Sequence, residues 1–180
     1  MSDRDVLADI IHPDAVINLA EQYKGRFSVV LYESKAPDSK LTIRGCPSDC
    51  LVLNLDSAFD NTRLFNGANG VSKRADFMLI SEEKKKVIFI EMKRSGSPNS
   101  DIIKQLTGSL CVFEYFKSVL QNFFQSKTHF SDYSLHFISA KHTTLNKGNT
   151  KIVKNGKCNN TPKNLLELSH TQSIEFNMLG

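Results

Sequence analysis

Apolar residues recur along the chain in short runs that are rich in β-branched and aromatic side chains. Such runs predict strands, and the polar or glycine-containing segments between them predict turns. The predicted strands cover residues 27–32, 41–44, 51–55, 75–80, 87–93, 134–140 and 173–178. The polar segment 56–72 carries two glycines and is predicted to be a long loop.

Two segments instead carry apolar residues at helical spacing. Residues 13–24 begin with Pro13 and precede Gly25, which suit the first helical position and the position after the last one. Residues 100–124 form a longer helix pattern, with Ser100 as the expected N-cap. Its apolar face comprises Ile102, Ile103, Leu106, Leu110, Phe113, Phe116, Leu120 and Phe124. A short third helix is expected around residues 162–168.

The runs 75–80 and 87–93 are separated only by the charged sequence SEEKKK, which predicts an antiparallel hairpin. The long helix and another strand follow it. This order of elements predicts a mixed α/β fold around one central β-sheet flanked by helices.

Composition limits the class of protein. The 180 residues are 40% hydrophobic and include 12 Phe, enough for one domain with a sizeable core and too many for a disordered chain. No apolar run approaches the roughly 18 residues of a membrane span. The acidic first residues lack the basic region of a signal peptide. We expect a cytoplasmic protein with a single domain over residues 1–180 and no membrane contact.

Charge is distributed unevenly along the chain. Residues 1–60 hold 6 basic and 10 acidic residues, a net charge of −4, whereas residues 61–180 hold 17 and 9, a net charge of +8. Six lysines and no acidic residue fall in residues 141–163. This asymmetry favours a polyanionic partner such as nucleic acid, and solvated surface lysines are the alternative.

The cysteines and histidines give a weaker signal. Cys46 and Cys50 are close in sequence, but the other two cysteines are distant and the five histidines show no metal-ligand spacing. Ordinary thiols are the favoured interpretation, with a zinc site as the less favoured one.

The predicted hairpin brings charged side chains together. Side chains alternate along a strand, so Glu91 and Lys93 emerge on the same face at the end of an otherwise apolar run. In an antiparallel hairpin the start of the preceding strand lies beside that end, and Asp76 stands there. The sequence thus predicts that two carboxylates and one ammonium group converge.

Such a cluster suits Mg²⁺, a hard cation that takes oxygen ligands and keeps several waters. The ion polarises a phosphate oxygen and acidifies water, and a neighbouring lysine orients that water or stabilises negative charge. The competing interpretation is a strand end with ordinary solvated charges.

These residues resemble the PD-(D/E)XK nuclease superfamily: Asp76 at a strand start, then Glu91-Met92-Lys93 at the end of the next strand, then a helix. The resemblance implies a restriction-endonuclease-like core of order αβββαβ. It implies that Asp76, Glu91 and the Met92 carbonyl hold Mg²⁺, for which Mn²⁺ can substitute, and that Lys93 serves the attacking water. Residue 75 is Ala, where the family name records Pro.

Further residues are candidates for the same site. The resemblance implies a polar residue on the following helix, where Gln105 fits, in a polar stripe with Asp101 and Ser109 that we expect opposite the apolar face. Some family members carry a glutamate on the first helix, and Glu21 is the candidate here. Lys73 and Arg74 precede Asp76 and are candidates for phosphate contact, with plain solvation as the alternative.

We therefore expect a Mg²⁺-dependent nuclease that hydrolyses phosphodiester bonds, with DNA favoured over RNA and endonuclease over exonuclease action. A defence, restriction or repair role would suit such an enzyme. The alternative is a non-catalytic nuclease-fold subunit or nucleic-acid-binding scaffold in a larger complex. A homodimer and a separate partner protein both stay open.

Overall fold

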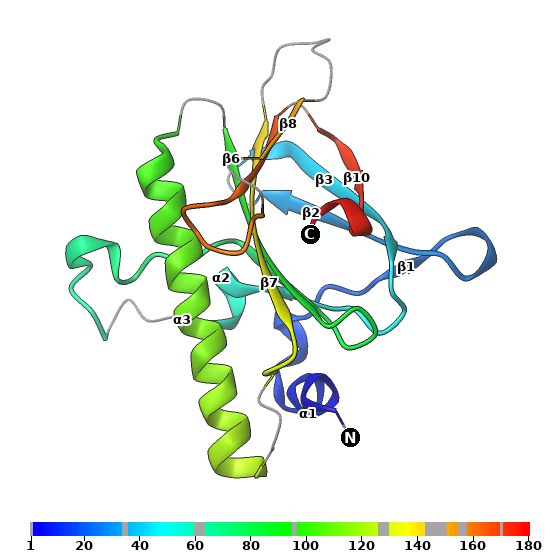
Figure 1. Cartoon of the computed structure of the whole chain (residues 1–180), viewed down its shortest axis with the longest axis vertical. Helices are drawn as coiled ribbons and strands as arrows, with labels where there is room; N and C mark the ends of the chain where they lie inside the picture. The colour runs from blue at the N-terminus through cyan, green and yellow to red at the C-terminus, as the bar shows by residue number, and fades with distance from the viewer. Residues whose placement is uncertain are drawn as a thin grey trace.

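The computed structural model describes residues 2–33, 36–59, 64–94, 97–125, 130–142, 151–154, 158–169 and 171–180. Within these residues the chain is a mixed α/β protein with two mixed β-sheets and three α-helices, one of them long (Figure 1). No helix in this part of the chain is long and apolar enough to cross a membrane.

The larger sheet has six strands in the order β4-β5-β6-β7-β9-β8. Their bounds are β4 Leu51–Asn54, β5 Phe77–Ser81, β6 Lys86–Arg94, β7 Ser134–His142, β8 Lys151–Lys154 and β9 Leu166–Ser169. Strands β4, β5 and β6 pair antiparallel, β6, β7 and β9 pair parallel, and β8 closes the edge antiparallel to β9. The hairpin predicted at residues 75–93 is confirmed as β5 and β6.

The smaller sheet has four strands in the order β1-β2-β3-β10. Their bounds are β1 Ala20–Glu21, β2 Phe27–Glu33, β3 Ala36–Cys46 and β10 Ser173–Glu175. Strand β10 pairs parallel with β3, so the end of the chain completes a sheet built mainly from its beginning.

The three helices are α1 Asp3–Ile10, α2 Leu55–Ala58 and α3 Asn99–Phe124. Four 3₁₀ turns also occur in the described residues: η1 Pro13–Ala15, η2 Tyr23–Gly25, η3 Ala68–Gly70 and η4 Phe176–Met178.

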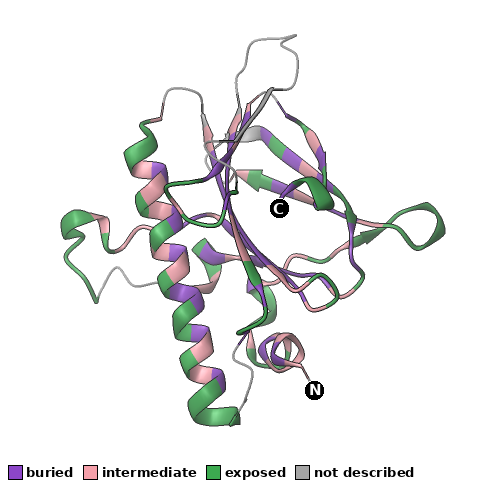
Figure 2. Ribbon diagram, viewed as in Figure 1, coloured by how far each residue is buried: buried purple, intermediate pink, exposed green. Residues whose placement is uncertain are grey.

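Two hydrophobic cores lie on opposite faces of the six-stranded sheet. Val87 and Phe89 of β6 pack with α1 and α3, whereas Ile88, Ile90 and Met92 pack with the smaller sheet. Figure 2 shows the buried positions of α3 on its side toward the strands. The expectation of one sheet flanked by helices is therefore wrong for one face, which a second sheet covers.

The helix predicted over residues 13–24 is wrong. The first helix is α1, capped by Ser2, whose hydroxyl accepts a hydrogen bond from the Asp5 backbone N–H at 3.2 Å. Pro13 begins only the short turn η1, and the backbone N–H of Ile17 donates to the Val52 carbonyl at 2.9 Å. Val16 and Ile17 pack from extended backbone beside β4, whereas Ala20 and Tyr23 are exposed, so the apolar spacing does not reflect a helix.

Other expectations need smaller corrections. The segment 162–168 contains the strand β9 instead of a helix, and the last strand ends at Glu175 and is followed by η4. The long helix is confirmed, but Pro98 occupies the N-cap position and Ser100 lies inside the helix. Phe124, expected on its apolar face, is exposed.

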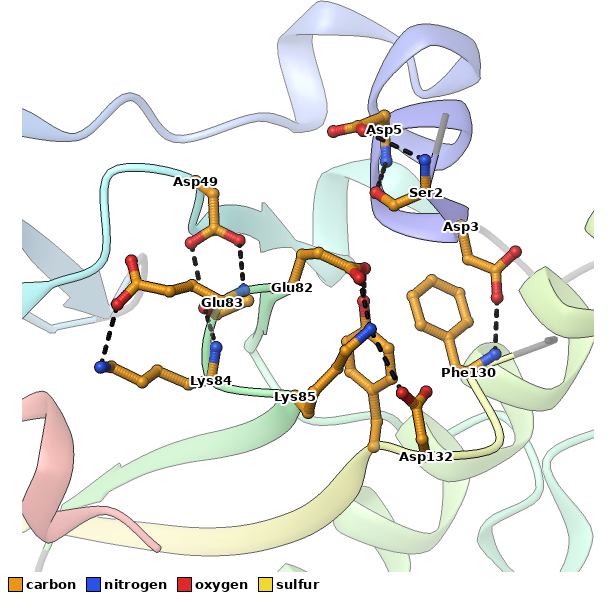
Figure 3. Close-up of polar contacts among 12 residues, drawn as sticks. Ser2, Asp3, Asp5, Asp49, Glu82, Glu83, Lys84, Lys85, Phe130 and Asp132 are labelled. Carbon is orange, nitrogen blue, oxygen red and sulfur yellow. Dashed lines mark hydrogen bonds and ion pairs between the residues drawn. The ribbon is translucent and has the colours of Figure 1, made fainter.

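Polar contacts hold the hairpin turn and α1 at one end of the larger sheet (Figure 3). The Asp49 carboxylate accepts hydrogen bonds from the Ser81 hydroxyl at 3.0 Å and from the Glu83 backbone N–H at 2.9 Å. The Asp3 carboxylate accepts one from the Phe130 backbone N–H at 2.8 Å. The two Asp49 bonds hold the turn between β5 and β6, and the Asp3 bond links α1 to the segment before β7.

Candidate active site

The register of the β5–β6 hairpin brings Asp76 and Glu91 together. Phe77 pairs with Ile90, so one further step places Asp76 opposite Glu91. The Asp76 Oδ2 atom accepts a hydrogen bond from the backbone N–H of Met92 at 2.7 Å, which extends the pairing beyond the strand. The two carboxylates thus lie at one end of the hairpin, as the alternation of side chains predicted.

Glu91 is a fully buried carboxylate, with 0% of its surface exposed. Its Oε1 atom lies 2.7 Å from the Lys93 Nζ atom, an ion-pair distance. Within the described residues no hydrogen-bond donor besides the Lys93 ammonium approaches either carboxylate oxygen. A buried carboxylate normally needs such donors or a cation, and Glu91 has acceptor sites to spare for one.

Burial changes the acid–base behaviour of this cluster. It raises the pKa of Glu91 to about 8, and the neighbouring Asp76 charge adds to the effect while Lys93 opposes it. It also raises the pKa of Asp76 to about 7, against the hydrogen bond from Met92. Burial lowers the pKa of Lys93, but the ion pair with Glu91 outweighs it and the net shift is upward, so Lys93 is an ammonium group.

A polar hollow of about 170 Å³ opens beside the cluster. Its lining combines predicted and unpredicted residues: Glu33, Asp56, Ser72, Lys73, Arg74, Asp76, Lys93 and Gln105. The Gln105 side chain, on α3, lines this hollow together with Asp76 and Lys93. Such a lining suits a charged, hydrated ligand better than an apolar one.

Sequence reasoning missed Glu33 and Asp56. Glu33 ends β2, on the side shared with the buried Val29 and Leu31, and its charge raises the pKa of Asp76. Asp56 lies in α2 and also raises that pKa. The alternation along β2 could have indicated the facing of Glu33, but nothing local indicated its approach to β5.

Lys73 and Arg74 lie at the hollow, and both already have protein partners. Lys73 Nζ donates to Asp101 Oδ1 at 3.0 Å and its side chain is 41% exposed. Arg74 Nε donates to the Leu55 carbonyl at 3.1 Å and lies 3.5 Å from Asp56 Oδ1. Arg74 therefore braces α2 against the start of β5, and Lys73 is the more accessible candidate for a phosphate contact.

Helix α3 presses directly on the segment before Asp76. The Ser109 hydroxyl accepts a hydrogen bond from the Ala75 backbone N–H at 2.6 Å, and a Cβ atom at Gly108 would lie 1.7 Å from the Lys73 carbonyl oxygen. Ser109 is fully buried, so the expected stripe opposite the apolar face is wrong at this position. The contact instead fixes the backbone that carries Asp76.

Glu21 is not part of this site, which corrects its placement on a first helix. It lies exposed on β1 and pairs with Phe27, at the opposite end of β2 from Glu33. The helix that would have carried it does not form, for the reason given above.

The remaining sequence signals lead to no other site. Cys46 and Cys50 are free and buried, and burial raises the pKa of Cys46 to about 11. His136 contacts Asn159 and Ser134, as a structural histidine does. Part of the lysine-rich segment, residues 143–150 and 155–157, lies outside the described residues.

Across the described ranges, no group of three or more His, Cys, Asp and Glu side chains is placed to hold a metal ion. Asp76 and Glu91 are a pair of carboxylates, which matches the way Mg²⁺ binds through one or two carboxylates and retains water. The buried Glu91 carboxylate, which has acceptor capacity beyond its ion pair with Lys93, is therefore compatible with a hydrated cation. No family model, curated protein or solved structure matches this chain.

Proposed function

We propose that this chain is a Mg²⁺-dependent nuclease that hydrolyses phosphodiester bonds, as an endonuclease acting on DNA in preference to RNA. The observation that carries the proposal is Glu91: a fully buried carboxylate with unused acceptor oxygens, beside a second carboxylate and an ammonium group. Perturbed carboxylates around a polar hollow are typical of functional sites.

Asp76, Glu91 and the Met92 backbone carbonyl would hold the Mg²⁺ ion. When bound, Mg²⁺ supplies positive charge that offsets the carboxylates and acidifies water in its coordination shell. The ion would also offset the cost of burying the Glu91 charge, so binding would stabilise the fold.

The chain's own residues would position the phosphodiester and the attacking water. Lys93 carries a positive charge into the hollow and would orient water or stabilise negative charge on the phosphate. Gln105 also lines the hollow, from α3, and can donate and accept hydrogen bonds. Lys73, partly exposed at the rim, would contact a neighbouring phosphate.

The fold assigned to this function is the restriction-endonuclease-like core. The support is local: an antiparallel hairpin that carries the acids, a long helix across the sheet, and the strand β7 pairing parallel with β6. The four-stranded second sheet would then be an elaboration of that core.

The test is cleavage of circular DNA, linear DNA and RNA with Mg²⁺, with Mn²⁺ and with EDTA. We expect metal-dependent cleavage of circular DNA that falls at least about a hundredfold in Glu91→Gln and Lys93→Ala, in line with removal of an electrostatic catalytic group. Lys117→Ala, on the exposed side of α3, is the matched control. DNA binding without cleavage by the wild type would favour the non-catalytic subunit, and equal cleavage by all variants would point to a contaminant.

A further inference from the structure

A second and larger hollow, of about 990 Å³, lies on the four-stranded sheet. Residues of the β1–β2 connection, β2, β3 and β10 line it, and none of them lines the hollow beside Asp76. Ser28 and Val30 of β2 line it, whereas the alternating residues Val29 and Leu31 point into the core. The hollow therefore lies on the face of this sheet that points away from the larger one.

Positive charge dominates its lining. Lys24, Arg26 and Arg44 line the hollow against one acidic residue, Glu175. In the part of the chain that the structure describes, Arg26 and Arg44 form no ion pair or side-chain hydrogen bond, and both are exposed. Three of the six basic residues of the acidic segment 1–60 thus gather here, which the net charge of that segment conceals. A polyanion is the complementary ligand.

Exposed aromatic rings accompany these cations. Tyr23 lines the hollow with 80% of its surface exposed, and Lys24 Nζ lies 5.1 Å from its ring centroid. Tyr32, 57% exposed, lies on the same side of β2 as Ser28 and Val30. Proteins that bind single-stranded nucleic acid usually combine cations, which contact the phosphate backbone, with exposed aromatic rings, on which the bases stack.

Strand β2 connects this hollow to the candidate active site. Phe27 lines the larger hollow and Glu33, at the other end of the strand, lines the smaller one. Six residue steps in a strand span about 20 Å. That distance corresponds to roughly six nucleotides at the 3.4 Å spacing of a stacked strand.

We propose that the outer face of β2 and its basic hollow bind single-stranded nucleic acid. The binding follows from charge and aromatic exposure alone. Glu33 lies on the other side of β2, with Val29 and Leu31, so a strand that reaches the acidic cluster would pass around the end of β2, and that step rests on the proposed nuclease function.

Binding is measured by fluorescence anisotropy with fluorescein-labelled oligodeoxynucleotides in EDTA, where metal-dependent cleavage cannot contribute. The variant is Arg26→Ala/Arg44→Ala, and the control is Lys84→Ala/Lys117→Ala, which removes two lysines that are ion-paired elsewhere. Because all four side chains are exposed or half-exposed, we expect equal melting temperatures. We expect the arginine variant to bind at least about tenfold more weakly, with the salt slope reduced by about 1.4 for two lost phosphate contacts.

A second variant separates stacking from charge. Tyr23→Ala should weaken binding between about five- and a hundredfold while leaving the salt slope unchanged, because it removes a base contact and no charge. A probe of about twelve nucleotides should bind more tightly than one of about four, which cannot span β2.

The proposal is overturned if the arginine variant matches the control in affinity and salt slope, or if duplex DNA binds as tightly as the single strand. Failure of the nuclease proposal has a separate signature: no Mg²⁺-dependent cleavage by the wild type, with the arginine effect on binding intact.

Discussion

Replacing Glu91 by Gln is expected to stabilise the metal-free protein, increasingly so as the pH rises. The substitution keeps the shape of the side chain and removes its charge. Glu91 is fully buried and no donor besides the Lys93 ammonium approaches its oxygens among the described residues, so its ionised form is poorly solvated in the folded state. A neutral amide avoids that cost.

The magnitude follows from the pKa shift. Burial raises the pKa of Glu91 from an ordinary 4.5 to about 8. Below pH 4.5 the Glu91 carboxyl is neutral in both the folded and the unfolded state, so its ionisation does not change the free energy of unfolding. Between pH 4.5 and 8 only the unfolded state ionises, so the wild type loses stability as the pH rises, and the loss is complete above pH 8. At about 1.4 kcal/mol per pH unit the loss reaches on the order of 5 kcal/mol, and this figure already includes the opposing effect of the ion pair between Glu91 and Lys93.

The assay is urea unfolding in EDTA at pH 5 and pH 8.5, followed by far-ultraviolet circular dichroism because the chain has no Trp. The measured quantity is the free energy of unfolding of Glu91→Gln minus that of the wild type. Glu83→Gln, at an exposed ion pair, is the control and should show a difference near zero at both pH values. The reasoning is refuted if the Glu91→Gln difference does not increase between pH 5 and pH 8.5.

The remaining predictions concern metal binding and the support of the site. A Mg²⁺ concentration of about 100 times Kd should stabilise the wild type by about 2.7 kcal/mol, seen as a rise in Tm that Glu91→Gln lacks. Gly108→Ala should lower the free energy of unfolding in urea by about 1 to 3 kcal/mol, because the added Cβ meets the Lys73 carbonyl. Thr107→Ala, at an exposed position, is the control and should not lower it. Ser109→Ala should cost about 1 to 3 kcal/mol by orphaning the Ala75 N–H, and an unchanged unfolding midpoint would contradict the contact.

Local sequence patterns were enough to predict the hairpin and the long helix. Alternation along residues 87–93 gave the correct facing of Glu91 and Lys93, because a strand has a fixed period and a short turn sets its register. The helix predicted over residues 13–24 is wrong because apolar residues that pack one by one from an extended backbone can have helical spacing by chance. The second sheet was missed because a strand pattern does not indicate which sheet a strand joins: β2 and β3 pair with each other, and β10 joins them across most of the chain.

The residues of the candidate site also differ in whether a local pattern could predict their position. Asp76, Glu91 and Lys93 belong to one hairpin, so their convergence was predictable. Glu33 arrives from the other sheet and was missed. Glu21 was placed wrongly because its assumed helix does not form.

The direct test of a metal-dependent nuclease site at Glu91 is Mg²⁺-dependent cleavage of circular DNA by purified wild type and by Glu91→Gln. Both proteins must first show cooperative unfolding, so that a lost activity is not a lost fold. We expect the wild type to nick or linearise the DNA with Mg²⁺ and not with EDTA, and Glu91→Gln to be inactive although it is at least as stable. Equal cleavage by the two proteins, or no cleavage of any nucleic acid by the wild type with Mg²⁺ or Mn²⁺, would contradict a nuclease site at Glu91.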